Sequence, residues 1–196
     1  MIEVRWARPL LTAERRDLAL AGLSSRERKR ELSEGFLAGR LVLKRLVTEL
    51  TGDPSPAIEQ VCADCGGPHG RPTYEGLWLS LSRCADAVLA AASTLPIGID
   101  VEPRGAASAH WTRTEAVLKA DGRGLRVDPD DVDFNESAAR IGGRGIRYLT
   151  ADLELDPSLQ VSLAVAEDAS GTAISRRGRR AALARTLTQV RGSRSW

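Results

Sequence analysis

The chain has 196 residues, and its 28 Lys and Arg against 26 Asp and Glu leave a formal net charge of only +2. That balance excludes neither nucleic acid nor an acidic protein as a partner, so the distribution of charge matters more than its sum. Apolar residues make up 42% of the chain, which excludes global disorder. No run approaches the roughly 18 apolar residues of a membrane-spanning helix, and we expect no membrane partner. The length predicts one domain or two small ones.

The start of the chain and its cysteines bear on its location. Residues 1–6 alternate apolar with charged side chains, which is typical of a strand and not of a signal peptide. Three cysteines without a secretion signal predict reduced thiols. We therefore expect a cytoplasmic protein.

Two helices are predicted after the first strand. Thr12 is suited to cap a short helix that runs to residue 21. Ser24 and Glu27 have the spacing of a capping box, which predicts a long helix over residues 26–50. The segment 51–54, which contains Gly52 and Pro54, is expected to end this helix. The buried stripe of this long helix consists of apolar residues at helical spacing: Leu32, Phe36, Leu43, Val47 and Leu50.

The rest of the chain is expected to be rich in strands. A loop over residues 62–72 precedes three short strands, over residues 78–82, 85–93 and 97–102. A helix over residues 109–120 stops at Gly122. Two or three strands should follow, the clearest over residues 159–166, and a basic helix is expected over residues 176–189.

This order of elements predicts an α+β fold, with two similar subdomains packed together. The N-terminal α+β subdomain would span residues 1–95. The C-terminal α+β subdomain, which carries the candidate metal site, would span residues 96–175, and a basic tail would cover residues 176–196. No internal sequence repeat is strong enough to establish that the two halves are duplicates.

Four charged residues have the spacing of a site that handles phosphate. Asp100 and Glu102 lie two apart on a predicted strand, so both carboxylates point to one face. Glu115 lies four residues before Lys119 on a predicted helix, so this pair shares a helix face. Folding that helix against the strand would gather three carboxylates beside one ammonium. Such oxygen ligands suit Mg²⁺, and Lys119 would neutralise charge that develops on a phosphate.

An ordinary structural role is the alternative for these residues. Two acids at the end of a strand are usually solvated. The pair Glu115 and Lys119 would then be a surface ion pair contributing roughly a few tenths of a kcal/mol.

Two segments add a resemblance to a known family. Residues 97–102 read IGIDVE, which resembles the G-(I/V)-D-(I/V)-E motif of the surfactin-type 4′-phosphopantetheinyl transferases. Residues 111–125 read WTRTEAVLKADGRGL, which resembles the W-(S/T)-x-K-E-A-x-x-K-x-x-G-x-G-L motif of the same family. Members transfer 4′-phosphopantetheine from coenzyme A to a serine of an acyl or peptidyl carrier protein, with Mg²⁺. The resemblance implies this holo-acyl-carrier-protein synthase activity and the 4′-phosphopantetheinyl transferase fold.

The resemblance also implies roles for the acidic site. Asp100, Glu102 and Glu115 would hold Mg²⁺, and Glu115 would help to deprotonate the carrier serine. Lys119 would contact the coenzyme A pyrophosphate and favour departure of 3′,5′-ADP. Trp111 would pack the helix rather than react.

Two cations on the long helix are expected to bind coenzyme A. Residues 34–40 are similar to the L-A-G-R segment of enterobactin-type members, and Arg40 shares a helix face with Lys44. The two side chains would grip the 3′-phosphate through charge-assisted hydrogen bonds. A solvated basic face is the alternative.

Three further residues are expected near the nucleotide. Arg71 belongs to a GRP segment similar to the family's G-(K/R)-P, and it would meet the nucleotide or its phosphates. Residues 80–84 read SLSRC and align with the family's S-(L/I)-(S/T)-H-(S/C/T). Ser82 and Arg83 would contact phosphate or adenosine there.

The sequence departs from the family pattern at three places. Arg83 stands where the family has histidine, and Thr114 stands where it has the first lysine of the K-E-A triplet. Only residues 103–110 separate Glu102 from Trp111, whereas members carry a longer stretch that borders the carrier-binding face. These departures leave open a second hypothesis, a degenerate relative that binds coenzyme A or a carrier protein with little catalysis.

The cysteine loop and the tail allow other interpretations. Cys62 and Cys65 form a C-x-x-C pair that supplies half of a tetrahedral zinc site, with His69 as a third ligand and Cys84 as a candidate fourth. Loop thiols near the nucleotide are the alternative. The tail arginines are suited to nucleic-acid phosphates, but aromatic residues make up only 4% of the chain, which leaves few stacking platforms. We therefore expect no nucleic-acid partner and a solvated terminal helix, which offers a surface that attracts acidic carrier proteins. The resemblance to the family implies a monomer.

Overall fold

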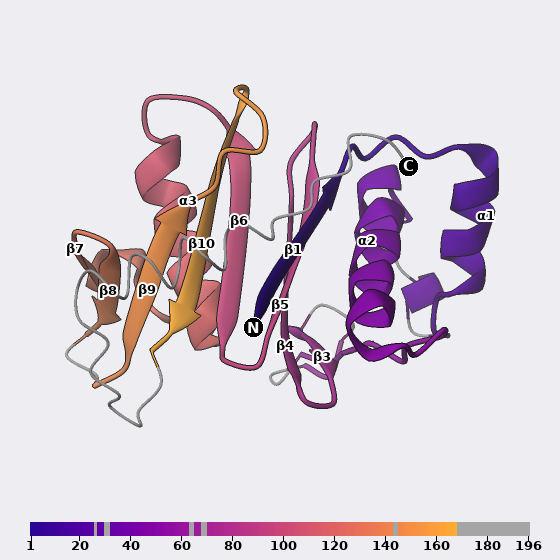
Figure 1. The fold of residues 1–196 in the computed structure, drawn as a ribbon, viewed down its shortest axis with the longest axis horizontal. Coiled ribbons are helices and arrows are strands. Elements are labelled where there is room, and N and C mark those ends of the chain that lie inside the picture. Colours follow the sequence, from indigo (N-terminus) through magenta and orange to yellow (C-terminus); the bar gives the residue numbers. More distant parts are fainter. Residues whose placement is uncertain (26, 30–31, 63–64, 68–69, 143–144, 168–196) are drawn as a thin grey trace.

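The computed structural model describes residues 1–25, 27–29, 32–62, 65–67, 70–142 and 145–167. Those residues form three α-helices and two five-stranded sheets in which every pair of neighbouring strands is antiparallel. The sheets face each other, and helices cover their outer sides (Figure 1). This mixture of helices and antiparallel sheets is compatible with the predicted α+β class. Among the described residues, no helix has both the length and the apolar character that crossing a bilayer requires.

The first sheet has the strand order β1-β5-β4-β3-β2. Its strands are β1 (Ile2–Ala7), β2 (Glu59–Gln60), β3 (Pro72–Tyr74), β4 (Leu77–Arg83) and β5 (Val88–Ser93). Helices α1 (Ala13–Ala21) and α2 (Glu34–Thr51) follow β1 in the chain. Helix α2 covers the outer face of this sheet and α1 packs against α2 (Figure 1). Thr12 caps α1 as predicted, because its hydroxyl accepts a hydrogen bond from Arg15 N.

The second sheet has the strand order β6-β10-β9-β8-β7. Its strands are β6 (Ile97–Pro103), β7 (Val132–Asn135), β8 (Ala138–Ile141), β9 (Arg147–Asp152) and β10 (Leu159–Ala166). Helix α3 (Ser108–Asp121) follows β6 and covers the outer face of this sheet (Figure 1). It ends as predicted at Gly122, which has a left-handed conformation with φ of 88°.

The two sheets follow the same topological path. In each sheet the first strand pairs with the last, the other strands follow in reverse chain order, and the covering helix comes after the first strand. The chain passes from one sheet to the other between Ser93 and Ile97.

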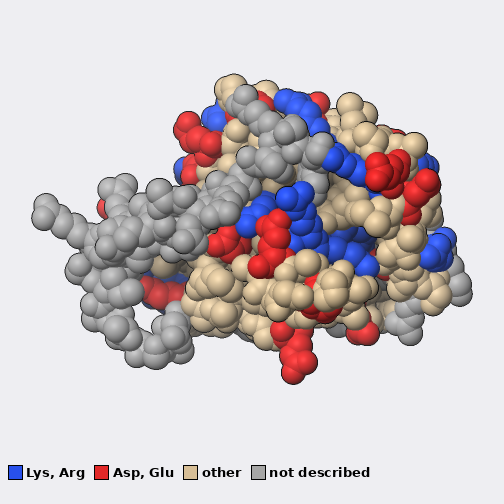
Figure 2. All heavy atoms as spheres, turned by 45° about the vertical axis from the view of Figure 1, so that its right-hand side comes forward, with Lys and Arg blue, Asp and Glu red and all other residues tan. Residues whose placement is uncertain are grey.

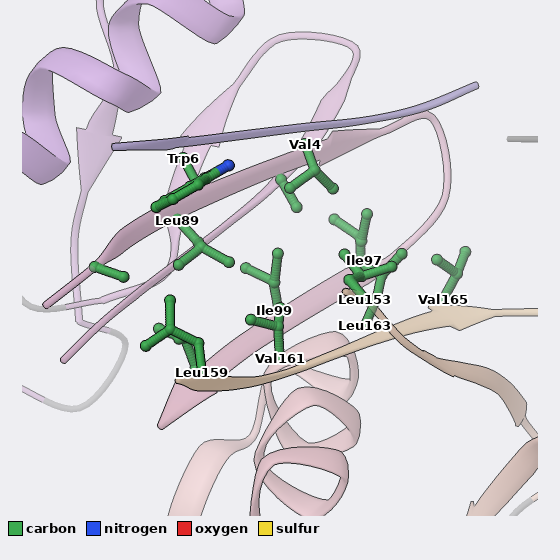
Figure 3. Packing of buried hydrophobic residues seen from close by; sticks show 13 residues of the cluster. Val4, Trp6, Leu89, Ile97, Ile99, Leu153, Leu159, Val161, Leu163 and Val165 are labelled. Carbon is green, nitrogen blue, oxygen red and sulfur yellow. The ribbon is translucent and has the colours of Figure 1, made fainter. Parts of the chain in front are cut away.

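Apolar side chains fill the space between the sheets (Figure 3). Val4, Trp6 and Leu89 come from the first sheet. The second sheet and Leu153, which directly follows β9, contribute a larger set: Ile97, Ile99, Val101, Leu153, Leu159, Val161, Leu163 and Val165. Separate apolar clusters lie beneath α2 and beneath α3. Both sheets are therefore buried on two faces along their central strands. Every residue of β5 and β10 is buried, including the polar residues Ser93, Gln160 and Ser162.

The predicted start of the long helix at residue 26 is wrong. The capping box forms, because Ser24 N donates to Glu27 Oε2 at 2.8 Å and Glu27 N donates to Ser24 Oγ at 3.3 Å. It opens only a 3₁₀ turn over Glu27–Lys29. Glu27 Oε1 also pairs with Arg40 at 2.6 Å. That ion pair holds the turn beside α2, so the turn does not continue into the helix.

A second serine caps the long helix. Ser33 Oγ accepts a hydrogen bond from Phe36 N at 3.3 Å, and α2 begins at Glu34. Leu32 therefore lies before the helix, although it still packs against the cluster that contains Phe36. The predicted end is confirmed, since Gly52 ends α2 in a left-handed conformation with φ of 77°.

Two smaller expectations also change. The strand predicted over residues 85–93 begins only at Val88, because a tight turn in which Cys84 N donates to Ala87 O at 2.9 Å precedes it. Four strands follow α3 instead of two or three, since short strands pair as the hairpin of β7 and β8. The predicted tail over residues 176–196 lies outside the described residues.

Candidate active site

The candidate site lies where helix α3 crosses strand β6. Asp100 and Glu102 are on the face of β6 that α3 covers, because the alternate residues of this strand point into the core between the sheets. The helix approaches closely at Gly98, where a Cβ atom would stand only 1.9 Å from Ala116 O. This close approach places the side chains of α3 directly over the carboxylates of the strand.

Lys119 joins carboxylates from both elements. Its Nζ donates to Asp100 Oδ1 at 2.5 Å and pairs with Glu115 Oε2 at 3.3 Å. Asp100 is only 3% exposed, and a second donor, the Ser82 hydroxyl, bonds the same oxygen at 2.7 Å. Because a buried carboxylate needs such compensation, this arrangement explains how Asp100 lies in the interior. The structure thus brings Asp100, Glu115, Lys119 and Ser82 together.

Glu102 adds to the negative charge of this group. It is half-buried, and burial raises the pKa of its carboxyl above the usual value. The charges of Asp100 and Glu115 raise that pKa further, whereas Lys119 lowers it. The charges of Asp100 and Glu115 therefore act on Glu102 beside a single ammonium, and the excess of negative charge favours a cation.

Serines from the first sheet bond the free edge of β6. Ile99 N donates to Ser80 Oγ at 3.0 Å, and Val101 N donates to Ser82 Oγ at 3.3 Å. Strand β6 is at the edge of its sheet, where outward backbone groups need partners from elsewhere. These bonds fix β6 beside β4 and bring the Ser82 hydroxyl within reach of Asp100.

The side chains of the site suit a hard divalent cation. Asp100 Oδ2 is buried and has no hydrogen-bond partner among the described residues. Carboxylate oxygens are the ligands that Mg²⁺ prefers, together with waters or phosphate oxygens. Within the described part of the chain, however, no group of three or more His, Cys, Asp or Glu side chains is gathered in a metal-holding arrangement. Lys119 instead pairs with both Asp100 and Glu115. The carboxylate oxygens are therefore suitable ligands for Mg²⁺, but in this structure they are arranged around the Lys119 ammonium.

Arg40 and Lys44 make contacts that hold helices together. Arg40 is 3% exposed, its Nε pairs with Glu27 Oε1 at 2.6 Å, and it also bonds Gln60. Lys44 Nζ donates to Gly22 O at 2.7 Å, at the end of α1. A ligand phosphate would therefore have to compete with Glu27 for Arg40.

Arg71 and Arg83 lie in different surroundings. Nη2 of Arg71 donates to backbone carbonyl oxygens where β6 begins and α3 ends. Arg83 is exposed at the end of β4 and lines a cavity of about 410 Å³ with Glu34 and Gly35 of α2. The structure therefore does not gather all the expected coenzyme A contacts around Lys119.

Two positions on α3 bear on the family pattern. Trp111 is 39% exposed and lies one helical turn before Glu115, so part of its side chain is at the surface beside the site. Thr114 is only 1% exposed. A lysine at position 114 would have to bury its ammonium there, which gives a physical reason for the small side chain.

Hydrogen bonds join the short connector between β6 and α3 to the start of β10. Arg104 N donates to Ser158 O at 2.8 Å, and its Nη2 donates to Leu159 O at 2.8 Å. Ser108 Oγ then closes the turn with Gly105. These bonds give the connector a defined path with no additional helix.

The cysteine loop keeps its two interpretations. Gly67 N donates to Cys65 Sγ at 3.4 Å, and Cys62 N donates to Gly67 O at 2.8 Å. The expected third zinc ligand, His69, lies outside the described residues. The zinc hypothesis therefore stays a prediction.

Two residues beside the site were missed in the sequence. Ser80 is on the same face of β4 as Ser82, so the period of two residues was a usable signal. Gln160 is 6% exposed and lies opposite Glu102 in the pairing of β10 with β6. Opposite residues of an antiparallel pair share a face, but no local pattern reveals which distant strands pair.

The surface of the molecule carries both signs of charge. Figure 2 shows Lys and Arg side chains gathered in the middle of one face, with Asp and Glu side chains beside them.

No model of a known protein family matches the chain, and no curated protein matches it in sequence. The functional interpretation therefore depends on the residues of the site.

Proposed function

We propose that the chain is a 4′-phosphopantetheinyl transferase that moves the phosphopantetheine of coenzyme A to a serine of an acyl or peptidyl carrier protein. One observation carries the proposal: Lys119 contacts Asp100 and Glu115 where α3 crosses β6, and Glu102 is near enough for the charges of all three residues to act on its carboxyl. Residues with these roles are what a pyrophosphate reaction needs, namely oxygen ligands for Mg²⁺, a base and a cation for the leaving group.

The proposed reaction assigns a step to each residue. The carrier serine oxygen attacks the β-phosphorus of coenzyme A, its proton passes to Glu115, and the bond from phosphorus to the 3′,5′-ADP oxygen breaks. Lys119 lies beside Glu115 and would neutralise the charge that develops on the departing ADP. Bound through Asp100, Glu102 and Glu115, Mg²⁺ would supply electrophilic stabilisation of the pyrophosphate.

The fold and the placement of the site residues on β6 and α3 give further support to the proposal. The fold expected for this class has two similar subdomains, and the two sheets here share one topological path. Asp100 and Glu102 lie on β6, and Glu115 and Lys119 lie on α3, which packs against that strand; this arrangement supports the proposal.

The alternative is a degenerate relative that binds coenzyme A or a carrier protein with little catalysis. The ion pair that already engages Lys119 and the buried ion pair of Arg40 favour it, because both cations would have to change partners to meet phosphates. Transfer activity and ligand binding therefore need separate measurements.

The decisive experiment is a transfer assay. The protein is mixed with coenzyme A, Mg²⁺ and a panel of apo carrier proteins, and the carriers are weighed by intact mass spectrometry. We expect a gain of one phosphopantetheine on at least one carrier, lost on adding a chelator and absent when the carrier serine is alanine. No gain on any carrier, with calorimetric binding of coenzyme A intact, would support the degenerate relative instead.

A further inference from the structure

Arg71 links the first sheet to the end of helix α3. Its Nη2 donates to Lys119 O at 2.7 Å, to Ala120 O at 3.2 Å and to Ile97 O at 3.0 Å. The last carbonyl groups of a helix lack partners within the helix, and a cation there also complements the helix dipole. One guanidinium therefore bonds the last turn of α3 and the first residue of β6 at once.

The residues on either side of Arg71 are closely packed. A Cβ atom on the preceding Gly70 would stand 2.1 Å from Val61 O, so only glycine fits at position 70. Pro72 follows, buried at the start of β3. The guanidinium carbon lies 4.8 Å from the centre of the Trp78 ring, which supports it from one side.

Gly122, the residue that caps the C-terminus of α3, lies against the Arg71 side chain. Gly122 has φ of 88°, and a Cβ atom there would stand 3.0 Å from Arg71 Nη1. Burial lowers the pKa of Arg71 from its usual value, and Asp121 counteracts this. Arginine remains charged even so, because its usual value is so high.

The contacts of Arg71 bear directly on Lys119. Arg71 holds the backbone carbonyl of Lys119, while the Lys119 ammonium contacts Asp100 and Glu115. The same guanidinium holds Ile97, three residues before Asp100 on β6. Arg71, which directly precedes β3, thus bonds both the helix that carries Lys119 and the strand that carries Asp100.

We propose that Arg71 is a positioning residue, which fixes the last turn of α3 against β6 and thereby sets Lys119 for the reaction. The effect of Arg71 on catalysis, through Lys119, rests on the proposed function. This role replaces the expected contact of Arg71 with the nucleotide phosphates, because Nη2 of Arg71 is already bonded to three carbonyl oxygens.

The test compares Arg71→Met and Arg71→Lys with the wild type, using both coenzyme A and 3′-dephospho-coenzyme A as donors. Arg126→Met is the matched control, since Arg126 is exposed in the turn after α3 and also donates to a backbone carbonyl. We expect Arg71→Met to lower kcat roughly 10- to 100-fold for both donors, with little change in KM. Arg71→Lys should recover part of kcat, because an ammonium still donates to carbonyl oxygens.

The ratio of kcat/KM for the two donors separates positioning from binding. A positioning residue leaves this ratio unchanged. A fall of the ratio toward one, with kcat intact, would show that Arg71 binds the 3′-phosphate and would overturn the proposal.

Hydrogen exchange tests the inference without any activity. In Arg71→Met, amides in the second half of α3 should exchange several-fold faster, while those of α2 stay unchanged. Unchanged exchange in α3 would refute the role of Arg71 in fixing the last turn of α3, even if the enzyme is active. If α3 exchanges faster in the variant while the wild type is inactive on every carrier, the proposed function is refuted but the role of Arg71 in fixing α3 is retained. If Arg71→Met does not fold, Arg71→Lys and Trp78→Leu give the same comparison.

Discussion

At the scale of single residues, the site is organised by the compensation of one buried charge. Asp100 is almost fully buried, and both Lys119 and Ser82 bond its Oδ1 atom. Removing either donor would leave a carboxylate with too few partners in a region of low dielectric. The other oxygen, Oδ2, is buried and has no hydrogen-bond partner among the described residues.

The role of Glu115 is tested by Glu115→Gln. The amide keeps the shape of the side chain but neither accepts the serine proton nor carries the ligand charge. We expect phosphopantetheine transfer, measured as the initial rate by intact mass, to fall at least about 100-fold. Glu75→Gln, at an exposed turn, serves as the control and should keep the wild-type rate. Near-normal turnover of Glu115→Gln would remove Glu115 from the mechanism.

Metal binding has its own readout in thermal stability. A cation that binds only the folded chain raises Tm by mass action. We expect saturating Mg²⁺ to raise the wild-type Tm by roughly 3–8 °C, and Asp100→Asn to lose most of that shift. Asp86→Asn, at an exposed position, should retain it. Equal shifts in all three proteins would mean that Mg²⁺ binds elsewhere.

At the scale of elements, the close packing of α3 on β6 is what turns separate motifs into a site. The residues of α3 reach β6 only because Gly98 leaves room for the backbone at Ala116. The end of the same helix meets β9, where Tyr148 OH donates to Asp121 Oδ2 at 3.4 Å. Arg71 bonds the last turn from the opposite sheet. Helix α3 is therefore fixed along its length by contacts with three strands or loops.

Gly98→Ala should separate the helix from the strand. The new Cβ would meet Ala116 O at 1.9 Å and Ala120 N at 2.6 Å, both of them backbone atoms that no side-chain rotation can move. We expect a loss of more than about 2 kcal/mol in the free energy of unfolding by urea. Gly105→Ala meets nothing within 4 Å and should be nearly neutral. A stable Gly98→Ala protein would contradict the packing described above.

The contact of α3 with β9 predicts a pH dependence. Burial, followed by the charge of Asp121 and their hydrogen bond, raises the pKa of Tyr148 from 10.0 to about 12. Between these values the unfolded chain has lost the phenolic proton and the folded chain retains it, so this group's contribution to stability falls as pH rises. Tyr148→Phe should therefore lose less stability than the wild type between pH 10 and about 12.

Tyrosine absorbance provides the direct check. The chain has 2 tyrosines, so Tyr74→Phe leaves Tyr148 as the sole phenol. Its phenolate absorbance should appear with a midpoint near 12, and a midpoint near 10 would contradict the burial of this group.

At the scale of the whole molecule, the two sheets share one core. The apolar cluster between them draws residues from β1 and β5 on one side and from β6 and β10 on the other (Figure 3). Neither sheet could expose this face to water without losing the burial of its central strands. We therefore expect the two sheets to unfold in a single cooperative transition.

Leu163→Ala tests this shared core. Leu163 lies on β10 in the cluster and is 1% exposed. We expect a loss of about 2–5 kcal/mol in the free energy of unfolding, seen equally by circular dichroism and by tryptophan fluorescence. Leu18→Ala, at a position 65% exposed on α1, should change stability little. Two separate transitions in either protein would show that the sheets unfold independently.

The sequence by itself determined the features that depend on local spacing. Glu115 and Lys119, four residues apart, meet at 3.3 Å because one helical turn brings them together. Asp100 and Glu102 share a face because strand side chains alternate. Thr12 caps α1 where predicted, and Gly52 ends α2 where predicted, since these ends depend on local hydrogen bonds and φ values.

Only the tertiary structure decided which partner each charged or polar group takes. Ser24 and Ser33 both have the chemistry of a helix cap, and the ion pair of Glu27 with Arg40 decided that the long helix starts at the second. The resemblance of the GRP segment implies that Arg71 contacts phosphate, yet Arg71 bonds the end of a helix 48 and 49 residues later in the chain. The physical reason is the same in each case: the free energy of burying a charge depends on neighbours brought by the pairing of distant strands, and no local spacing encodes that pairing.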